Sequence, residues 1–324
     1  MEENTEQRVD LTLFSEKIQE LKDRIASVIV GQEQTVDLVL TAILANGHVL
    51  IEGVPGVAKT LLARLTARLI DADFSRVQFT PDLMPSDVLG TTVFNMKTNG
   101  FDFHQGPIFA DIVLVDEINR APAKTQAALF EVMEERQISI DGTTHRMGDL
   151  YTILATQNPV EQEGTYKLPE AQLDRFLMKI TMDYPSLEEE VNILERHHTN
   201  AALVKLEDVT PVLTKEELLS LRAFMNQVFV DRTLLQYIAL IVQQTRTSKA
   251  VYLGASPRAS VAMLQSSKAY ALLQGRDFVT PEDIKFVAPY VLQHRLILTA
   301  EAEMEGYSPV KVTQRLIDKV EVPK

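Results

Sequence analysis

The chain has 324 residues, with 45 acidic and 32 basic side chains, which gives a formal net charge of −13. Hydrophobic residues make up 45% of the sequence, which is enough for a packed core and excludes a wholly disordered chain. The acidic balance argues against broad binding to the phosphate backbone of nucleic acids. The absence of cysteine excludes disulfides and thiolate metal sites. At roughly 150 residues per domain, we expect about two domains.

No apolar run approaches the ~18 residues that span a bilayer. The segment Met1–Asp10 is polar and acidic, which is not typical of a secretory signal. We therefore expect a cytoplasmic protein with no membrane span.

The first regular pattern is an apolar repeat at Phe14, Ile18, Leu21, Ile25 and Val28. Steps of three and four residues place these side chains on one face of a helix. We assign residues 1–27 to an N-terminal helical segment.

Short apolar runs then alternate with helical segments, which predicts an α/β domain. Because the runs are continuous rather than alternating, they favour a parallel sheet covered on both faces. The five expected strands are residues 48–52, 76–80, 112–115, 150–156 and 176–182. We expect helices at 60–70 and at 122–135, the second with Pro122 in its first turn. Asp141-Gly142 between two alternating runs predicts a hairpin over Ile138–Met147.

After Pro185 the pattern becomes helical, and we place a domain boundary there, with domains at 28–185 and 186–324. Thr214 and Glu217 form a capping box. Ser256 and Thr280 each precede a proline suited to the first helical position, so both are predicted caps. Gly275 suits the residue just past a helix end.

The segment between the first strand and its following helix has the pattern of a phosphate-binding loop. It comprises Gly53, Val54, Pro55, Gly56, Val57, Ala58, Lys59 and Thr60. Backbone N–H groups and the helix N-terminus hold phosphate, Lys59 reaches the β and γ phosphates, and Thr60 ligates Mg²⁺. Ala58 stands where a glycine is expected; it fits if its φ is negative and is strained if φ is positive.

Polar side chains follow two other strands. Asp116 and Glu117 end the 112–115 run, where Asp116 can hold Mg²⁺ and Glu117 can act as general base. Asn158 follows the 150–156 run and can orient the attacking water, although Asn before Pro159 is also a common turn.

Three arginines are candidates for stabilising the transition state. Arg175, just before the last strand, suits an arginine finger that acts on a neighbouring subunit, and Arg120 is a second candidate. The alternative for Arg175 is an ion pair within the chain, with Asp174 or another acid. Arg258 lies in a helical first turn, where the dipole disfavours a cation unless an anion such as a nucleotide phosphate is near; otherwise it is a solvated side chain.

In this order, the motifs resemble those of AAA+ ATPases and, more narrowly, of the MoxR family. The resemblance rests on Gly31-Gln32, the phosphate-binding loop with its Ala58, Asp116–Pro122, Ala155–Pro159, Glu170–Phe176 and Ser256-Pro257-Arg258. It covers about residues 28–300. It implies ATP and Mg²⁺ as cofactors and adds Val30, Gly31, Gln32 and Leu61 to the nucleotide-binding residues.

The resemblance also implies a fold and a role. The fold is a five-stranded parallel sheet in the order 5-1-4-3-2 between helices, followed by an all-α lid, with an insertion around Leu83–Phe109. Such proteins are similar to magnesium chelatase ATPase subunits and work as rings, usually hexamers. Their role is chaperone-like: remodelling a client, inserting a metal or maturing a complex, usually with a partner that carries a von Willebrand factor A domain.

Two other functions are compatible with these motifs. One is a nucleic-acid motor, because helicase-like AAA+ proteins share the insertion and the hairpin. The insertion, however, carries Lys97 as its only strong base against Asp87 and Asp102, so no nucleic-acid partner is expected. The other is a nucleotide-gated switch, which has no need of a positioned base such as Glu117.

Overall fold

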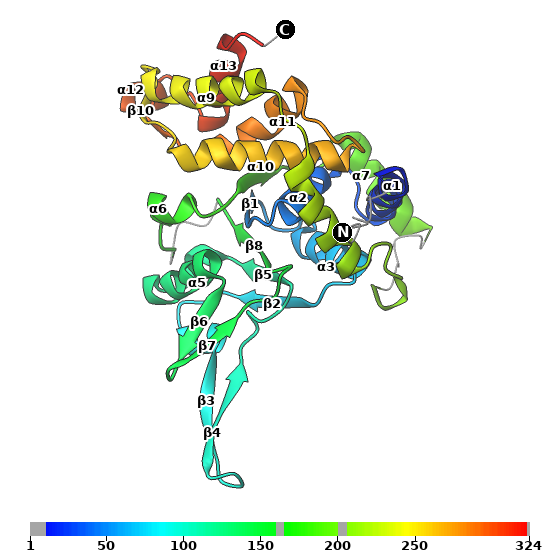
Figure 1. Ribbon diagram of the computed structural model, residues 1–324, viewed down its shortest axis with the longest axis vertical. Helices are drawn as coiled ribbons and strands as arrows, with labels where there is room; N and C mark the ends of the chain where they lie inside the picture. The colour runs from blue at the N-terminus through cyan, green and yellow to red at the C-terminus, as the bar shows by residue number, and fades with distance from the viewer. Residues whose placement is uncertain (1–10, 160–164, 200–205, 323–324) are drawn as a thin grey trace, which may run out of the picture.

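The computed structural model describes residues 11–159, 165–199 and 206–322. The molecule is elongated: a layered α/β body lies in the middle, a helical lid at one end and a projecting β-hairpin at the other (Figure 1). Among the described residues, none of the helices combines the length and the apolar character needed to cross a bilayer.

The body is built on a five-stranded parallel sheet. Its strands are β1 (Val49–Gly53), β2 (Phe74–Gln78), β5 (Ile112–Asp116), β8 (Thr152–Gln157) and β9 (Met178–Met182). They lie in the order β2-β5-β8-β1-β9, which confirms the predicted order 5-1-4-3-2. The edge strand β2 starts two residues earlier than predicted, because its register with β5 pairs Phe74 with Ile112.

Alternate residues of the strands face two hydrophobic layers. Val49 and Ile51 pack with α2 (Glu33–Leu44) and α3 (Lys59–Leu69). Leu50 and Val113 face the opposite way and pack with α5 (Ala123–Glu135). Pro122 occupies the cap position of α5 rather than its predicted first turn. The sheet therefore stands between α3 and α5.

The predicted N-terminal helix is α1 (Leu11–Val28). It buries Phe14, Ile18, Leu21 and Ile25, as the apolar spacing predicted, in the core that also contains α2.

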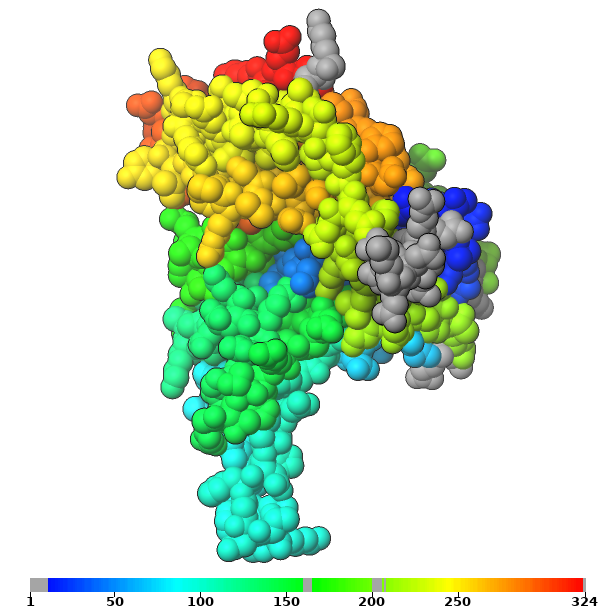
Figure 2. Space-filling model, in the orientation of Figure 1, coloured from blue at the N-terminus to red at the C-terminus, as the bar shows by residue number. Residues whose placement is uncertain are grey.

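Two hairpins extend from the body. The insertion forms α4 (Pro85–Leu89), β3 (Gly90–Asn95) and β4 (Gly100–Gln105), and β3–β4 makes the arm that projects in Figure 2. The predicted second hairpin is β6 (Gln137–Ile140) and β7 (Thr143–Arg146). Asp141 and Gly142 both have positive φ at its turn, as Asp-Gly hairpins require.

The rest of the chain is mainly helical. Its α-helices are α6 (Glu170–Leu173), α7 (Leu187–His198), α8 (Lys215–Phe224), α9 (Arg232–Thr247), α10 (Pro257–Leu273), α11 (Pro281–Leu292), α12 (Ala300–Met304) and α13 (Pro309–Lys319). The 3₁₀ turns are Ile118–Arg120, Leu206–Asp208 and Met225–Gln227. The lid also contains a two-stranded sheet, β10 (Val251–Leu253) with β11 (Ile297–Leu298). The expectation of an all-α lid was therefore wrong in this detail.

Two of the helix signals predicted after Pro185 are met as expected. Thr214 and Glu217 form the capping box of α8, and Gly275 has a φ of +73° just beyond α10. The Ser256 hydroxyl does not cap α10; it donates to Asp174 Oδ2 at 3.4 Å, because the chain brings this carboxylate to the helix start.

Contacts of α8 bear on the domain boundary. Arg222 Nη2 donates to Ile43 O on α2, and the chain before α8 bonds to the end of α3 through Val212 N and Leu69 O at 2.8 Å. The boundary near Pro185 stays a prediction. We propose that residues through α8 belong with the body and that the lid starts after it.

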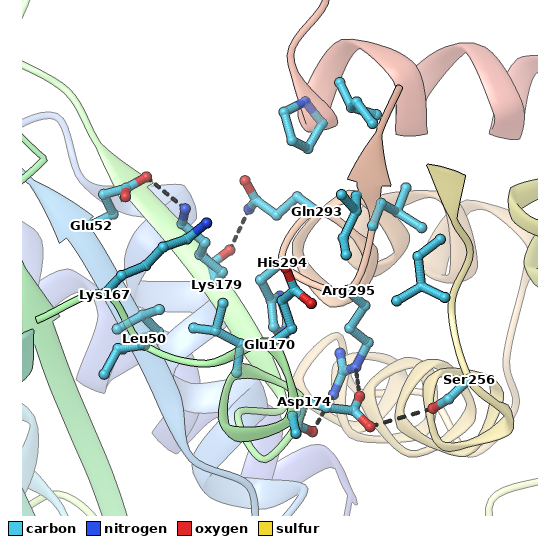
Figure 3. A pocket seen from close by; sticks show the side chains of 18 of the residues that line it. Leu50, Glu52, Lys167, Glu170, Asp174, Lys179, Ser256, Gln293, His294 and Arg295 are labelled. Atoms are coloured by element: carbon cyan, nitrogen blue, oxygen red, sulfur yellow. Dashed lines mark hydrogen bonds and ion pairs between the residues drawn. The ribbon is translucent and has the colours of Figure 1, made fainter. Parts of the chain in front are cut away.

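The lid is hydrogen-bonded to the edge strand β9 and to the segment just before it (Figure 3). Gln293 Nε2 donates to Lys179 O at 2.5 Å, and Arg295 Nη2 donates to Phe176 O at 2.7 Å. Arg295 Nε also bonds Asp174 Oδ1 at 2.7 Å. A cavity of about 620 Å³ lies beside these contacts, and none of residues 53–60 is among the described residues that line it.

Candidate functional site

The predicted phosphate-binding loop joins β1 to α3. Gly56 has a φ of +88°, and Ala58, which directly precedes α3, has a φ of +61°. The condition for an unstrained alanine is therefore not met, and a left-handed L-residue costs about 1–2 kcal/mol. Pro55 and Gly56 are exposed, so the loop presents its backbone to solvent there. Val57 is buried and anchors the loop to the hydrophobic core.

Lys59 is the first residue of α3, and its Nζ donates to Gly53 O at 2.7 Å across the loop. Burial lowers the pKa of Lys59, and the negative charges of Asp116 and Glu117 oppose that shift. The ammonium group and both carboxylates thus share one site. Thr60 and Leu61, which follow on α3, are half-buried.

Strand register brings the predicted catalytic groups to one edge of the sheet. Asp116 lies opposite Gln78 at the ends of β5 and β2. Glu52 pairs with Gln157, so Gly53 and Asn158 are the next residues on adjacent strands. Asn158 is buried. The carboxyl edge of a parallel sheet is where such folds bind ligands.

Asp116 is held by two side chains. Its Oδ2 accepts from Arg76 Nε at 2.6 Å, and its Oδ1 accepts from the Thr156 hydroxyl at 3.0 Å. The same hydroxyl oxygen accepts from Glu117 N at 3.0 Å. Thr156 on β8 therefore fixes the end of β5, and it is almost fully buried.

Glu117 leaves the strand in a left-handed conformation, with a φ of +56°, and its side chain has different partners from those of Asp116. Its Oε2 accepts from Gln78 Nε2 at 2.8 Å and from Arg120 Nη1 at 3.0 Å. Arg120, considered above as a finger for a neighbour, here pairs with the predicted base of its own chain.

The residues fit the Mg²⁺ that this site implies. Magnesium is usually held by one or two carboxylates together with substrate phosphates and water. Asp116 supplies a carboxylate beside the loop, and Thr60 supplies a hydroxyl at the start of α3. Within the described residues there is no cluster of three or more His, Asp or Glu side chains that could hold a metal without a nucleotide.

The remaining two arginines are brought together by a residue that sequence reasoning missed. Arg175 Nη1 lies 2.7 Å from Glu134 Oε2, and Arg258 Nη2 lies 2.9 Å from Glu134 Oε1. Arg175 does not pair with the adjacent Asp174, whose carboxylate is bonded by Arg295. The anion that offsets the unfavourable placement of Arg258 in its first helical turn is thus Glu134.

This arginine pair lies toward the amino edge of the sheet. In the register of β1 with β9, Gly53 pairs with Met182 and Val49 pairs with Met178. Met178, where β9 begins, is therefore about 13 Å along the strand from the residue that pairs with Gly53, at 3.3 Å per residue. Arg175 precedes that start. The end of α5 is at the same edge, because His48 Nε2, just before β1, lies 3.1 Å from Met133 O.

The segment Val30–Gln32 lies between α1 and α2 and is half-buried. Gly31 has a φ of +73°, and a β-carbon there would clash with the Glu189 carboxylate of α7, so α7 packs directly on this glycine. Gln32 is the cap residue of α2 and accepts from the Thr35 hydroxyl at 2.8 Å. Its predicted contact with nucleotide stays a prediction.

Sequence reasoning missed four residues that organise the site: Arg76, Gln78, Glu134 and Thr156. Arg76 and Gln78 act through the pairing of β2 with β5, which a local pattern does not reveal. Thr156 lies within the Ala155–Pro159 motif. The predicted strand order already placed this motif on the strand beside Asp116, which was the signal that could have identified Thr156. Glu134 carried no signal, since it is one of several acids near the end of a helix.

Two segments of the chain match known protein families. Residues 48–178 match the family described as "ATPase family associated with various cellular activities (AAA)". Residues 243–318 match a family described as an AAA lid domain. The two matches cover the phosphate-binding loop with the carboxyl edge, and most of the helices from α9 onward.

Individual relatives are similar over nearly the whole chain. Identity is 48% to the uncharacterized protein YeaC of Bacillus subtilis, over 93% of both chains. It is 44% to Chaperone MoxR1 of Mycobacterium tuberculosis, over 93% of this chain and 81% of the relative. It is 31% to Protein MoxR of Methylorubrum extorquens, over 91% of both. A crystal structure of a Cytophaga hutchinsonii protein assigned as an ATPase superposes with a TM-score of 0.88 at 41% identity, over 97% of both chains.

Proposed function

The chain belongs to the MoxR family of AAA+ ATPases, and we propose that it hydrolyses ATP with Mg²⁺ in a ring and uses the cycle to remodel a protein client. The observation that carries the proposal is the convergence of Lys59, Asp116, Glu117 and Asn158 at the carboxyl edge of the sheet. A protein that only binds nucleotide has no need of the second carboxylate.

The residues divide the work of hydrolysis between them. The loop amides and Lys59 bind the phosphates. Thr60 and the Asp116 carboxylate would hold Mg²⁺, which would supply further positive charge to the phosphates. Glu117 takes the proton from the attacking water, and Asn158 orients that water. The bonds from Gln78 and Arg120 to its Oε2 fix the position of the Glu117 carboxylate.

Arg175 and Arg258 complete the site of a neighbouring subunit rather than their own. The loop is at the carboxyl edge, whereas the arginine pair lies toward the amino edge and on the α5 side of the sheet. A side chain cannot bridge that separation while it is bonded to α5. A head-to-tail arrangement places one edge against the other, and such contacts form a ring when the rotation between neighbouring subunits closes.

Exposed apolar surface supports self-association. Helix α7 buries none of its residues, and Leu187, Val191 and Leu194 form a stripe on it with exposed fractions of 82%, 46% and 65%. A stripe of this kind is typical of surface that is covered in an assembly. We propose a ring, with six subunits as the expected number.

The projecting arm favours a protein client over a nucleic acid. Val93, Phe94, Met96 and Phe101 are exposed on β3–β4 and its tip, and Phe94 and Phe101 contact each other edge to face. Binding to phosphates requires several basic side chains, and the arm offers Lys97. Membership of the family implies a chaperone-like role, in client remodelling, metal insertion or complex maturation, with a partner that carries a von Willebrand factor A domain.

The test is the Glu117→Gln variant, measured for ATP binding by calorimetry and for phosphate release. We expect ATP binding to persist while turnover falls at least ~10²-fold, the low end for general base catalysis. Turnover near that of the unmodified protein would refute the assignment of Glu117 as base.

A further inference from the structure

One carboxylate joins two arginines that come from distant parts of the chain. Arg175 lies between α6 and β9, and Arg258 lies in the first turn of α10 in the lid. Glu134, at the end of α5, accepts one arginine on each oxygen, at 2.7 and 2.9 Å. The three side chains therefore form a small cluster across the boundary between body and lid.

The cluster is held tightly on one side and loosely on the other. Arg175 Nη1 also donates to Phe130 O on α5 at 2.7 Å, and its side chain is 30% exposed. The Arg258 side chain is 63% exposed, and its described ion pair is the one with Glu134. Glu134 thus sets where Arg258 points, and it adds a second restraint on Arg175.

The charges require such a carboxylate. Two guanidinium groups that approach the same point repel each other, and the repulsion is larger near a protein surface than in bulk water. Arg258 is also disfavoured by the dipole of its own helix. With Glu134 between them, both cations stay in one place before any phosphate arrives, which is preorganisation of the kind that electrostatic catalysis uses.

We propose that Glu134 is a positioning residue that holds Arg175 and Arg258 together as one unit directed at the γ-phosphate of ATP bound to the neighbouring subunit. The inference rests on the proposed function, since it requires that these arginines act on a neighbour. It adds that the two arginines act as a pair and that the pair depends on an acid of their own subunit.

The test compares Glu134→Gln with Glu134→Asp and Glu131→Gln in the full-length assembled protein. Glu131 is exposed one turn earlier on α5 and has no ion pair among the described residues, so its variant is the matched control. For Glu134→Gln we expect kcat to fall up to ~10²-fold, as for a misplaced catalytic group, with KM for ATP within about twofold. Glu134→Asp, which keeps the charge, should lie between Glu134→Gln and the unmodified protein.

Two further measurements separate positioning from a merely structural role. If Glu134 acts through the arginines, adding Glu134→Gln to the Arg175→Ala/Arg258→Ala double variant causes no further loss of kcat. Mixing Glu134→Gln with Glu117→Gln subunits should restore activity, because an intact Glu117 then meets an intact arginine pair. Thermal unfolding and size-exclusion chromatography establish that each variant is folded and assembled.

Three results would overturn the inference: an unchanged kcat in assembled Glu134→Gln, an independent loss in the arginine-deficient background, or no recovery in the mixture. The corresponding mixture of Arg175→Ala with Glu117→Gln separates the two levels of the argument. If it recovers and the Glu134→Gln mixture does not, the role of Glu134 is wrong and the proposed function stands. If neither recovers, the arginines do not act on a neighbour, and the proposed function fails in that part.

Discussion

Replacement of Thr156 by valine tests how the sheet prepares the catalytic carboxylates. Valine has nearly the same shape, so the change removes one hydroxyl and little else. That hydroxyl donates to Asp116 Oδ1 and accepts from Glu117 N, each at 3.0 Å. We therefore expect two losses at once, one in stability and one in turnover.

The size of the stability loss follows from the two bonds. A hydrogen bond to a charged group contributes about 1.5–3 kcal/mol, and a buried N–H left without a partner costs about 1–3 kcal/mol. Since both bonds use one oxygen, the losses are not fully additive, and we expect about 3–4 kcal/mol. That is a large share of the ~5–15 kcal/mol typical of a folded domain.

Urea denaturation followed by circular dichroism gives the free energy of unfolding of Thr156→Val and of Thr156→Ser. Serine keeps the hydroxyl and loses a methyl group, which costs about 0.8 kcal/mol. Phosphate release from Thr156→Val should fall at least ~10-fold, since Glu117 loses its backbone restraint and misplaced groups lose up to ~10². Equal stability of the two variants, within about 1 kcal/mol, together with normal turnover, would refute the reasoning.

Three more predictions concern the loop and a buried histidine. Lys59→Ala should lose ATP affinity, because the phosphates lose their nearest cation; unchanged binding by calorimetry would remove Lys59 from the site. Ala58→Gly should be as stable as the parent or more so in thermal unfolding, since φ is +61°, whereas a bulkier Ala58→Val should be less stable; the reverse order would contradict the left-handed conformation. His48 is buried, accepts from Ile153 N at 3.0 Å, and has its pKa lowered from 6.5 to about 3, chiefly by burial. Between these pH values the unfolded chain binds a proton that the folded chain excludes. His48 therefore lowers the free energy of unfolding by about 1.6 kcal/mol as the pH falls from 6.5 to 5. His48→Gln should remove that part of the pH dependence in urea titrations, and an unchanged slope would contradict it.

Much of the fold was predictable because its signals are local. Continuous apolar runs identified the strands, and the loop between β1 and α3 identified the nucleotide site. Lys59 and Asp116 carry their chemistry within short motifs. The structure confirms the strand order that the family resemblance implied.

The rest depends on contacts between segments far apart in the chain. Ser256 has the local pattern of a helix cap, yet its hydroxyl bonds Asp174, because the fold brings a stronger acceptor to it. Gln78 reaches Glu117 only through strand register. Glu134 gains its importance from two arginines 41 and 124 residues away, whose pairing no local spacing predicts.

The most direct test of the account is a mixing experiment with Arg175→Ala and Glu117→Gln. Each variant alone should bind ATP and hydrolyse it poorly, one for lack of the cation and the other for lack of the base. A cation of this kind contributes ~10³–10⁵ in rate in related phosphoryl transfers. Combined at equal ratio, in rings shown to contain both, they should hydrolyse ATP faster than either alone, because Glu117 of one subunit then meets Arg175 of the next. Activity no greater than that of either variant would contradict a site shared between subunits.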